Sequence, residues 1–463
     1  MKKLIILLIF TYSIISFCES MTVVNNGGTR VLVVDSGTDF SHPEFTGKVL
    51  NETAEVSGTA GQDDDNNGYI DDVAGWNFVE NNNTMVDTSI LPAFYDEVLR
   101  YSDITEKYYY DYDSLTEDDF TFTESFHSDD MKYSWFDFIG GFSHGTHVAG
   151  IISRNNNYVS LKAIKYLNVG TAPSLDRMKE FLIYRISLDG RSSRQMSYEE
   201  IETYFKEYGD TEVAAYQNVS DYVSFCVPRV INCSYGDNRV NLMEFMKEAM
   251  VDTFGYSTAD TEEAYKLVDI YARNVSVRTD EKVYEKATDA LIIIAAGNEA
   301  ENVDDFISSP IDMNIENKMV VAATFDDNLI ADFSCYGVNK VDVAAPGVLI
   351  RSTYPNGKYG LMSGTSQATP YVSKIAARAF LLRNTLTPLE VKKIIMETVD
   401  KKDWLKDKVK TSGCVNMYRV EQAVRFMNQG LTIDQAIAKA NSGTGTVRTS
   451  SRNIDLNDPL IQK

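Results

Sequence analysis

The sequence predicts an α/β fold in which a mostly parallel central sheet carries helices on both faces. Short apolar runs of strand length alternate with longer helical patterns along the chain. This alternation is typical of parallel strands joined by helical crossovers. Polar motifs follow the strand-like runs or begin the helical ones, which is where open parallel sheets place their functional sites.

The expected elements follow one another in a regular order. Strand-like runs lie at residues 31–34, 158–167, 229–233, 291–296, 319–323 and 341–345. Helical patterns lie at residues 144–154, 366–383, 388–399 and 416–428, and further ones lie around 174–187, 197–207 and 241–254. One helix start is well marked, because Thr387 supplies an N-cap, Pro388 the first turn and Glu390 a capping-box carboxylate.

The first strand ends in a carboxylate. Residues 31–37 read VLVVDSG, a short apolar run followed by an acid and a turn. This pattern predicts a buried parallel strand that presents Asp35 at its carboxyl end. Taken alone, Asp35 is equally well a turn residue at the end of a strand.

Histidine is scarce in this chain, so a candidate base is easily traced. The four histidines are His42, His127, His144 and His147. His144 lies in FSHGTHVAG at the start of an apolar helical pattern, and its flanking residues favour it as the base. His147 lies three residues later on the same helix, so we expect it to pack or hydrogen-bond structurally.

Ser366 begins the next long helical pattern, in GTSQATP. The hydroxyl then lies beside backbone N–H groups and the positive end of the helix dipole, where an anion forming on an attacked carbonyl can be held. The candidate residues follow in the order Asp, His, Ser, which differs from the order of α/β-hydrolases. Taken alone, Ser366 could instead be a purely structural helix N-cap.

With these residues in view, the chain resembles the subtilisin-like serine proteases. Six blocks match in order: DSGTDFSHPEF at 35–45, HGTHVAG at 144–150, VINCSYG at 230–236, AAGNE at 295–299, VDVAAPG at 341–347 and GTSQATP at 364–370. The resemblance implies a subtilisin-like three-layer fold. It also implies a serine endopeptidase, and the alternative class is an inactive module that binds peptides or proteins in the same cleft.

The resemblance assigns roles to individual residues. Asp35 would orient the imidazole, His144 would act as general base and acid, and Ser366 would be the nucleophile. Asn298 would supply the side-chain donor of the oxyanion hole. Taken alone, Asn298 could instead be a structural residue of a Gly-Asn turn. The segment of Ser234, Tyr235 and Gly236 would pair with the backbone of an extended peptide substrate.

An acidic loop predicts a calcium site. Residues 63–72 read DDDNNGYIDD, with oxygen ligands at alternate positions, and we expect the ligands Asp63, Asp65, Asn67, Tyr69 and Asp71. An EF-hand requires a glutamate at the twelfth position, where this chain has an alanine. The alternative is an acidic surface turn. Catalysis itself needs no cofactor.

Composition restricts the partners. The formal net charge is −23, which argues against nucleic acid or an anionic membrane surface as a partner. No stretch after the N-terminal segment reaches the length of a membrane span, so no transmembrane segment is expected. The resemblance to subtilisin-like proteases implies protein or peptide substrates, while the oligomeric state is not readable.

The N-terminal residues predict export. Residues 1–20 have two lysines, an apolar run and a small polar end, which is the pattern of a signal peptide. A secreted or periplasmic protein follows from this interpretation. Lipid attachment through Cys18 is a minor alternative, because Phe17 is bulkier than such signals usually allow.

Four cysteines follow Cys18, and they are Cys226, Cys233, Cys335 and Cys414. An even number in an exported protein permits disulfides, but the pairing is not readable from the sequence. Cys233 lies inside an apolar strand pattern, where a buried free thiol is an equal alternative.

The domain organisation follows from the spread of the blocks. We expect a signal peptide at 1–20, a peptidase domain at 21–430 with insertions near 80–142 and 170–290, and a helix remnant with a disordered tail at 431–463. The insertions either wall the substrate cleft or decorate the surface. Two departures from the family pattern are the absence of a long pro-segment between the signal and the first strand, and Gln367 after the candidate nucleophile.

Overall fold

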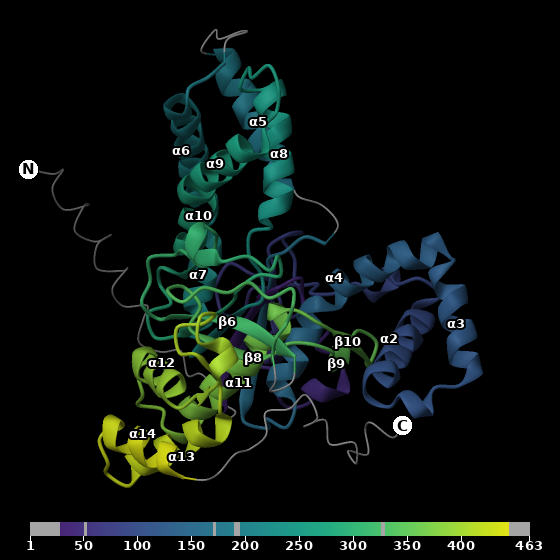
Figure 1. Cartoon of the computed structure of the whole chain (residues 1–463). Helices are drawn as coiled ribbons and strands as arrows, with labels where there is room; N and C mark the ends of the chain where they lie inside the picture. Colours follow the sequence, from purple (N-terminus) through teal and green to yellow (C-terminus); the bar gives the residue numbers. More distant parts are fainter. Residues whose placement is uncertain (1–27, 51–52, 170–172, 189–194, 326–328, 444–463) are drawn as a thin grey trace, which may run out of the picture.

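The computed structural model describes residues 28–50, 53–169, 173–188, 195–325 and 329–443 (Figure 1). A ten-stranded sheet forms the centre, in the order β11-β12-β8-β6-β5-β4-β1-β3-β2, with β7 paired to β6. The strands are β1 (Thr29–Asp35), β2 (Gly75–Asn77), β3 (Val159–Lys165), β4 (Val230–Cys233), β5 (Leu291–Ala295), β6 (Lys318–Phe325), β7 (Leu329–Ile330), β8 (Val343–Pro346), β11 (Asp400–Lys401) and β12 (Gly413–Cys414). A separate antiparallel hairpin pairs β9 (Ile350–Tyr354) with β10 (Lys358–Met362).

Fourteen α-helices lie in the described part of the chain. They are α1 (Thr53–Ser57), α2 (Tyr95–Tyr110), α3 (Glu117–His127), α4 (Asp130–Ser153), α5 (Pro173–Leu188), α6 (Tyr198–Ala215), α7 (Gln217–Phe225), α8 (Arg239–Asp252), α9 (Thr261–Tyr271), α10 (Val277–Tyr284), α11 (Thr365–Leu382), α12 (Pro388–Glu397), α13 (Met417–Asn428) and α14 (Ile433–Ser442). A π-helical turn, η4 (Ala272–Ser276), joins α9 to α10.

The predicted α/β fold is confirmed. The six predicted strand-like runs form β1, β3, β4, β5, β6 and β8, and these strands pair in parallel. Side chains of one strand alternate between two cores: Val31 and Val33 pack with α4 and α11 on one face, whereas Leu32 and Val34 pack with α7 and α10 on the other. Burial on both faces explains why these runs are continuously apolar.

One helix boundary differs from the prediction. The pattern around His144 predicted a helix that begins there, but α4 already begins at Asp130. Asp129 caps it, with its Oδ1 accepting a hydrogen bond from Lys132 N at 3.2 Å. The first turns of α4 pack in the cluster that includes Ile139, and its later turns pack against β1 and α11. His144 therefore lies inside a long helix, beside the carboxyl end of β1.

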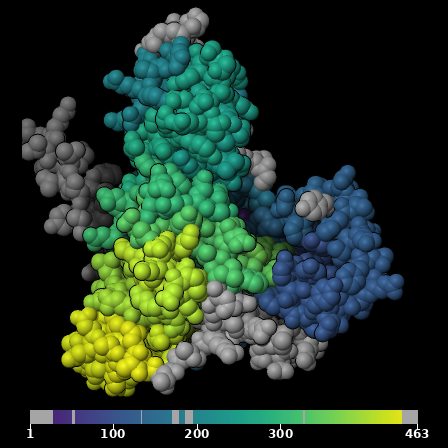
Figure 2. Space-filling view, in the orientation of Figure 1, coloured from purple at the N-terminus to yellow at the C-terminus, as the bar shows by residue number. Residues whose placement is uncertain are grey.

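Two groups of helices project from this body (Figures 1 and 2). The helices α5, α6, α8 and α9 form one projection around a core of their own, which includes Phe205, Phe254 and Tyr271. The helices α2 and α3 and the first turns of α4 form the second projection around Leu99, Phe126 and Ile139. Both lie where the sequence predicts insertions.

The four cysteines after residue 18 are free and buried, and they are Cys226, Cys233, Cys335 and Cys414. All four belong to the core cluster on one face of the sheet, where a thiol packs as a small hydrophobe. The structure therefore favours the free-thiol alternative over disulfides.

Within the described residues, no helix is both long and apolar enough to cross a membrane. The predicted signal peptide and most of the predicted tail lie outside these residues.

Candidate active site

Asp35 and His144 meet at the carboxyl end of β1. His144 Nδ1 lies 2.7 Å from Asp35 Oδ1, which also accepts a hydrogen bond from Ser36 N at 2.7 Å. A carboxylate only accepts, so Nδ1 carries the proton and the neutral imidazole leaves Nε2 free as a base. Burial alone would lower the pKa of His144, but the charge of Asp35 and this hydrogen bond outweigh it and raise that pKa.

A glycine allows this approach. A Cβ at Gly145 would lie 2.2 Å from Gly37 O and 3.1 Å from Asp35 Cβ. Any side chain there would therefore push α4 away from the end of β1 and separate the pair. This explains why a glycine follows His144 in the middle of a helix, where it otherwise lowers stability.

The other three histidines contact groups outside the candidate active site. His42 Nε2 lies 3.0 Å from Lys358 O, and His127 Nε2 lies 2.9 Å from Tyr101 OH in the projecting helices. His147 is fully buried, and its Nε2 lies 2.9 Å from Ile350 O. Burial and the neighbouring His144 lower the pKa of His147 to about 3. Its contact with the hairpin agrees with the structural role predicted for it.

Ser366 lies in the first turn of α11, as predicted. Its Oγ donates to Ser234 O at 3.0 Å, while Ser234 Oγ donates to Ser366 O at 2.8 Å. Asn232 in β4 supports this turn, because its Nδ2 donates to Ser234 Oγ at 2.9 Å and its Oδ1 accepts from Ser373 Oγ at 2.8 Å. Asn232 was not predicted to be a site residue, although it is a polar residue within an otherwise apolar strand.

Asn298 follows β5 beside the same helix start. Its Oδ1 accepts hydrogen bonds from Thr365 N at 2.8 Å and from Thr365 Oγ1 at 3.1 Å. These bonds fix the amide so that Nδ2 points away from Thr365, and Nδ2 has no hydrogen-bond partner among the residues described. An exposed donor with a fixed orientation is what an oxyanion hole requires. Thr365 is a second residue that sequence reasoning missed.

The segment of Ser234, Tyr235 and Gly236 follows β4 directly. Tyr235 turns inward, and its hydroxyl donates to Asp280 Oδ1 at 3.0 Å. Gly236 is exposed, and a Cβ there would lie 3.2 Å from Ser309 O. Ser234 therefore lies against Ser366, whereas the Tyr235 side chain points toward Asp280.

Asp280 positions this segment through hydrogen bonds. Besides Tyr235, its carboxylate accepts hydrogen bonds from Ser309 Oγ at 2.6 Å and Tyr166 OH at 3.3 Å. Burial raises the pKa of Asp280 to about 6 in spite of these donors. Asp280 comes from α10, so no local motif marked it in the sequence.

The acidic loop folds differently from the expected ligand set. Asp63 accepts hydrogen bonds from Asn67 N and Gly68 N within the turn, and Asp71 accepts from Gly61 N at 2.7 Å. Asn67 Oδ1 accepts from Tyr69 N at 2.8 Å. Of the five expected ligands, the structure brings only Asp65 into a cluster of carboxylates.

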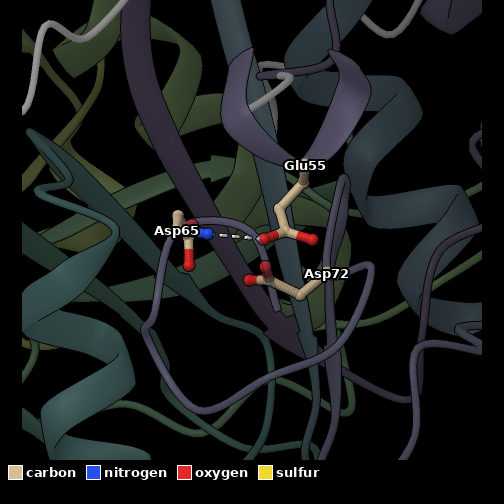
Figure 3. Close-up of side chains that lie close together, drawn as sticks. All are labelled: Glu55, Asp65 and Asp72. Atoms are coloured by element: carbon tan, nitrogen blue, oxygen red, sulfur yellow. Dashed lines mark hydrogen bonds between the residues drawn. The ribbon is translucent and has the colours of Figure 1, made fainter. Parts of the chain in front are cut away.

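That cluster consists of Glu55, Asp65 and Asp72, whose ligand oxygens lie within 4.8 Å of one another (Figure 3). Glu55 Oε1 accepts hydrogen bonds from Asp64 N and Asp65 N, while its Oε2 is buried without a partner. Burial and the charges of Asp72 and Glu55 raise the pKa of Asp65 to about 7, despite a backbone hydrogen bond from Asn67. One buried cation, Lys162, contacts Asp72 Oδ2 at 3.1 Å. Three converging carboxylates and an unpartnered oxygen fit a hard cation such as calcium.

Comparisons with known proteins identify the family of this chain. The model of the subtilase family matches residues 26–420. Subtilisin-like protease 1 of Plasmodium berghei (strain Anka) is 23% identical over 421 residues, which cover 89% of this chain and 52% of that protein. An extracellular basic protease of Dichelobacter nodosus is 36% identical over 160 residues, which cover 32% of this chain and 26% of that protein.

A solved structure is similar along most of its length. The crystal structure of a lanthipeptide protease aligns with a TM-score of 0.45 at 18% identity, covering 87% of this chain and 89% of that chain. The chain spans about half the length of the Plasmodium protein. Since the family model covers most of the chain, this protein belongs to the subtilase family.

Proposed function

We propose that this protein is a secreted serine endopeptidase that hydrolyses peptide bonds through Asp35, His144 and Ser366. The observation that carries the proposal is the 2.7 Å contact between His144 Nδ1 and Asp35 Oδ1. It fixes the tautomer in which Nε2 is the base, and α4 packs against α11, whose first turn carries Ser366. Family membership supports the same reaction.

The mechanism follows from these groups. The Ser366 hydroxyl turns from Ser234 O toward His144, which takes its proton as Oγ attacks the carbonyl carbon of the substrate. Asp35 stabilises the imidazolium, and Asn298 Nδ2 donates to the oxyanion together with backbone N–H groups at the start of α11. His144 then gives the proton to the leaving amine, and water repeats the sequence to release the acyl group.

Substrates are proteins or peptides bound in an extended form. We expect the substrate backbone to pair with residues 234–236, which lets many sequences bind because strand pairing does not read side chains. Export through residues 1–20 and a structural calcium ion at the Glu55, Asp65 and Asp72 cluster belong to the same proposal. The ion would add a charge that offsets the three carboxylates and takes no part in the reaction.

Covalent labelling tests the reaction directly. A fluorophosphonate probe should label the wild-type protein at Ser366, and Ser366→Ala and His144→Ala should both abolish labelling and peptide hydrolysis. His127→Ala is the matched control and should keep both, because His127 contacts Tyr101 in the projecting helices. A folded wild-type protein that neither reacts with the probe nor cleaves peptides would instead support the inactive binding module.

A further inference from the structure

A cavity of about 760 Å³ lies at the amino-terminal ends of the central strands β1 and β4, opposite to the candidate active site. Residues 28–30 at the start of β1, Arg229 just before β4 and residues 380–385 at the end of α11 contribute to its walls. The same three elements carry Asp35, Ser234 and Ser366 at their other ends. The cavity is therefore separated from the catalytic groups by the length of a strand, about 20 Å for six residue steps.

Arginines dominate the lining. Arg30, Arg229 and Arg383 all line the cavity, and none of its lining residues is acidic. This is unusual in a chain with 67 acidic and 44 basic residues. Several other arginines pair with carboxylates, as Arg239 does with Asp269 at 2.6 Å and Arg351 with Asp103 at 2.6 Å.

The three lining arginines have no ion pair among the residues that the structure describes. Arg229 donates to Leu386 O and stacks on Phe380, but its Nε is buried without a partner. Arg383 donates to Met427 O at 3.1 Å and to Asn428 Oδ1 at 3.4 Å. Carbonyl oxygens thus satisfy some of the guanidinium donors. The charge of Asp289 acts on Arg229, but the two side chains form no ion pair.

The rim of the cavity also carries backbone strain. Val227 has a φ of 44°, in the left-handed region that β-branched residues rarely adopt. Its side chain is 54% exposed, so burial does not offset the strain. Strained residues of this kind concentrate at binding sites, where the surrounding structure holds them in place.

From these observations we infer that the cavity is a binding site for a small, multiply charged oxyanion. Guanidinium groups bind phosphate and carboxylate oxygens through paired, charge-assisted hydrogen bonds. A cavity of 760 Å³ is within the size range of small-molecule sites. The hydroxyl of Thr385 and the amide of Asn384 line the same space and would complete the polar contacts. A phosphorylated molecule and a polycarboxylate share this chemistry.

Titration calorimetry with pyrophosphate and with citrate, at matched ionic strength, tests the inference and distinguishes the two sources. The protein titrated is the full chain with the substitution Ser366→Ala. This substitution prevents self-digestion and leaves the cavity intact. We expect saturable binding of at least one of the two anions and a rise in melting temperature that grows with its concentration. Sodium chloride at the same ionic strength should produce neither effect.

Substitutions locate the binding. Arg30→Gln should weaken binding by roughly tenfold or more, and Arg30→Lys should restore part of it. Arg154→Gln is the matched control, since Arg154 also lacks an ion pair among the described residues but lies outside the cavity. If Arg30→Gln fails to fold, Arg383→Gln tests the same wall. Absence of saturable binding of both anions, or equal binding by the cavity and control variants, would overturn the inference.

Discussion

At the scale of single residues, the contact between His144 and Asp35 predicts how hydrolysis depends on pH. His144 must be neutral to accept the Ser366 proton, and Asp35 raises its pKa above the ordinary 6.5 despite the opposing effect of burial. As pH falls through this raised pKa, kcat/KM should therefore decrease. A pH profile of peptide hydrolysis measures the midpoint. A midpoint clearly below 6.5 would contradict the pairing.

Asp280 predicts a change in substrate binding. Its carboxylate accepts hydrogen bonds from Tyr235, Tyr166 and Ser309, so it positions the peptide-binding segment. Asp280→Asn should raise KM roughly threefold to tenfold with a smaller change in kcat, as expected when one buried hydrogen bond of about 1 kcal/mol is lost. Steady-state kinetics on one peptide separates the two constants.

The thermal stability of the same variant provides the control. Burial raises the pKa of Asp280 from 3.8 to about 6. The folded protein therefore holds this proton more tightly than the unfolded chain, so the free energy of unfolding falls as pH rises from 3.8 to about 6 and stays reduced above that pH. Asp280→Asn removes that ionisation, so its melting temperature at pH 8 should not fall in step with the rise in KM. A large fall in melting temperature with unchanged KM would assign Asp280 a structural role only.

At the scale of elements, the loop at 55–72 predicts a response to chelation. The carboxylates of Glu55, Asp65 and Asp72 repel one another unless a cation lies between them. A ligand that binds only the folded state stabilises it by about 2.7 kcal/mol at 100 times its dissociation constant. Removing divalent cations should therefore lower the melting temperature, while a folded sample keeps its peptidase activity.

Variants of this loop locate the ion. Asp65→Asn and Glu55→Gln should each reduce the difference in melting temperature between calcium and chelator. Asp113→Asn, an exposed acid in the second projection, should leave this difference unchanged. Equal melting of the wild-type protein with and without calcium would identify the loop as an acidic surface turn.

At the scale of the whole molecule, the projection of α5, α6, α8 and α9 has a core separate from the body. Phe205 packs in it against Tyr271 and Phe254, with ring centroids 5.6 Å and 6.0 Å away. Phe205→Ala should cost about 3–5 kcal/mol locally. Hydrogen exchange should accelerate in these helices while the probe still labels Ser366. Val251→Ala, at an exposed position of α8, is the control.

The labelling of Ser366 in Phe205→Ala tests whether the projection unfolds independently of the body. Loss of labelling in Phe205→Ala would mean that this projection and the body unfold together. The connection through η4 and α10 to Asp280 is the path by which that would happen, since α10 packs against both α6 and α7.

Much of this protein was determined by local sequence. Each parallel strand is buried on both faces, so it appears as a continuous apolar run, and this allowed the strands to be located. The order of Asp35, His144 and Ser366, the strand that ends at Asp35 and the helix that begins beside Ser366 predicted the candidate site residues, although His144 lies inside its helix. The geometry of Asp35 with His144, and of Asn298 with Thr365, is consistent with the roles that the resemblance implies.

The tertiary structure decided what depends on distant segments meeting. Asp65 and Asp72 lie in the loop that the sequence singled out, but Glu55 joins them only because the short helix α1 folds over that loop. Asp280 reaches the peptide-binding segment from a helix 45 residues further along the chain. The cavity lined by Arg30, Arg229 and Arg383 is built from separate segments, none of which carries a motif. Spacing along a chain reports neighbours within an element, whereas burial, charge balance and unpartnered groups arise only once the elements pack together.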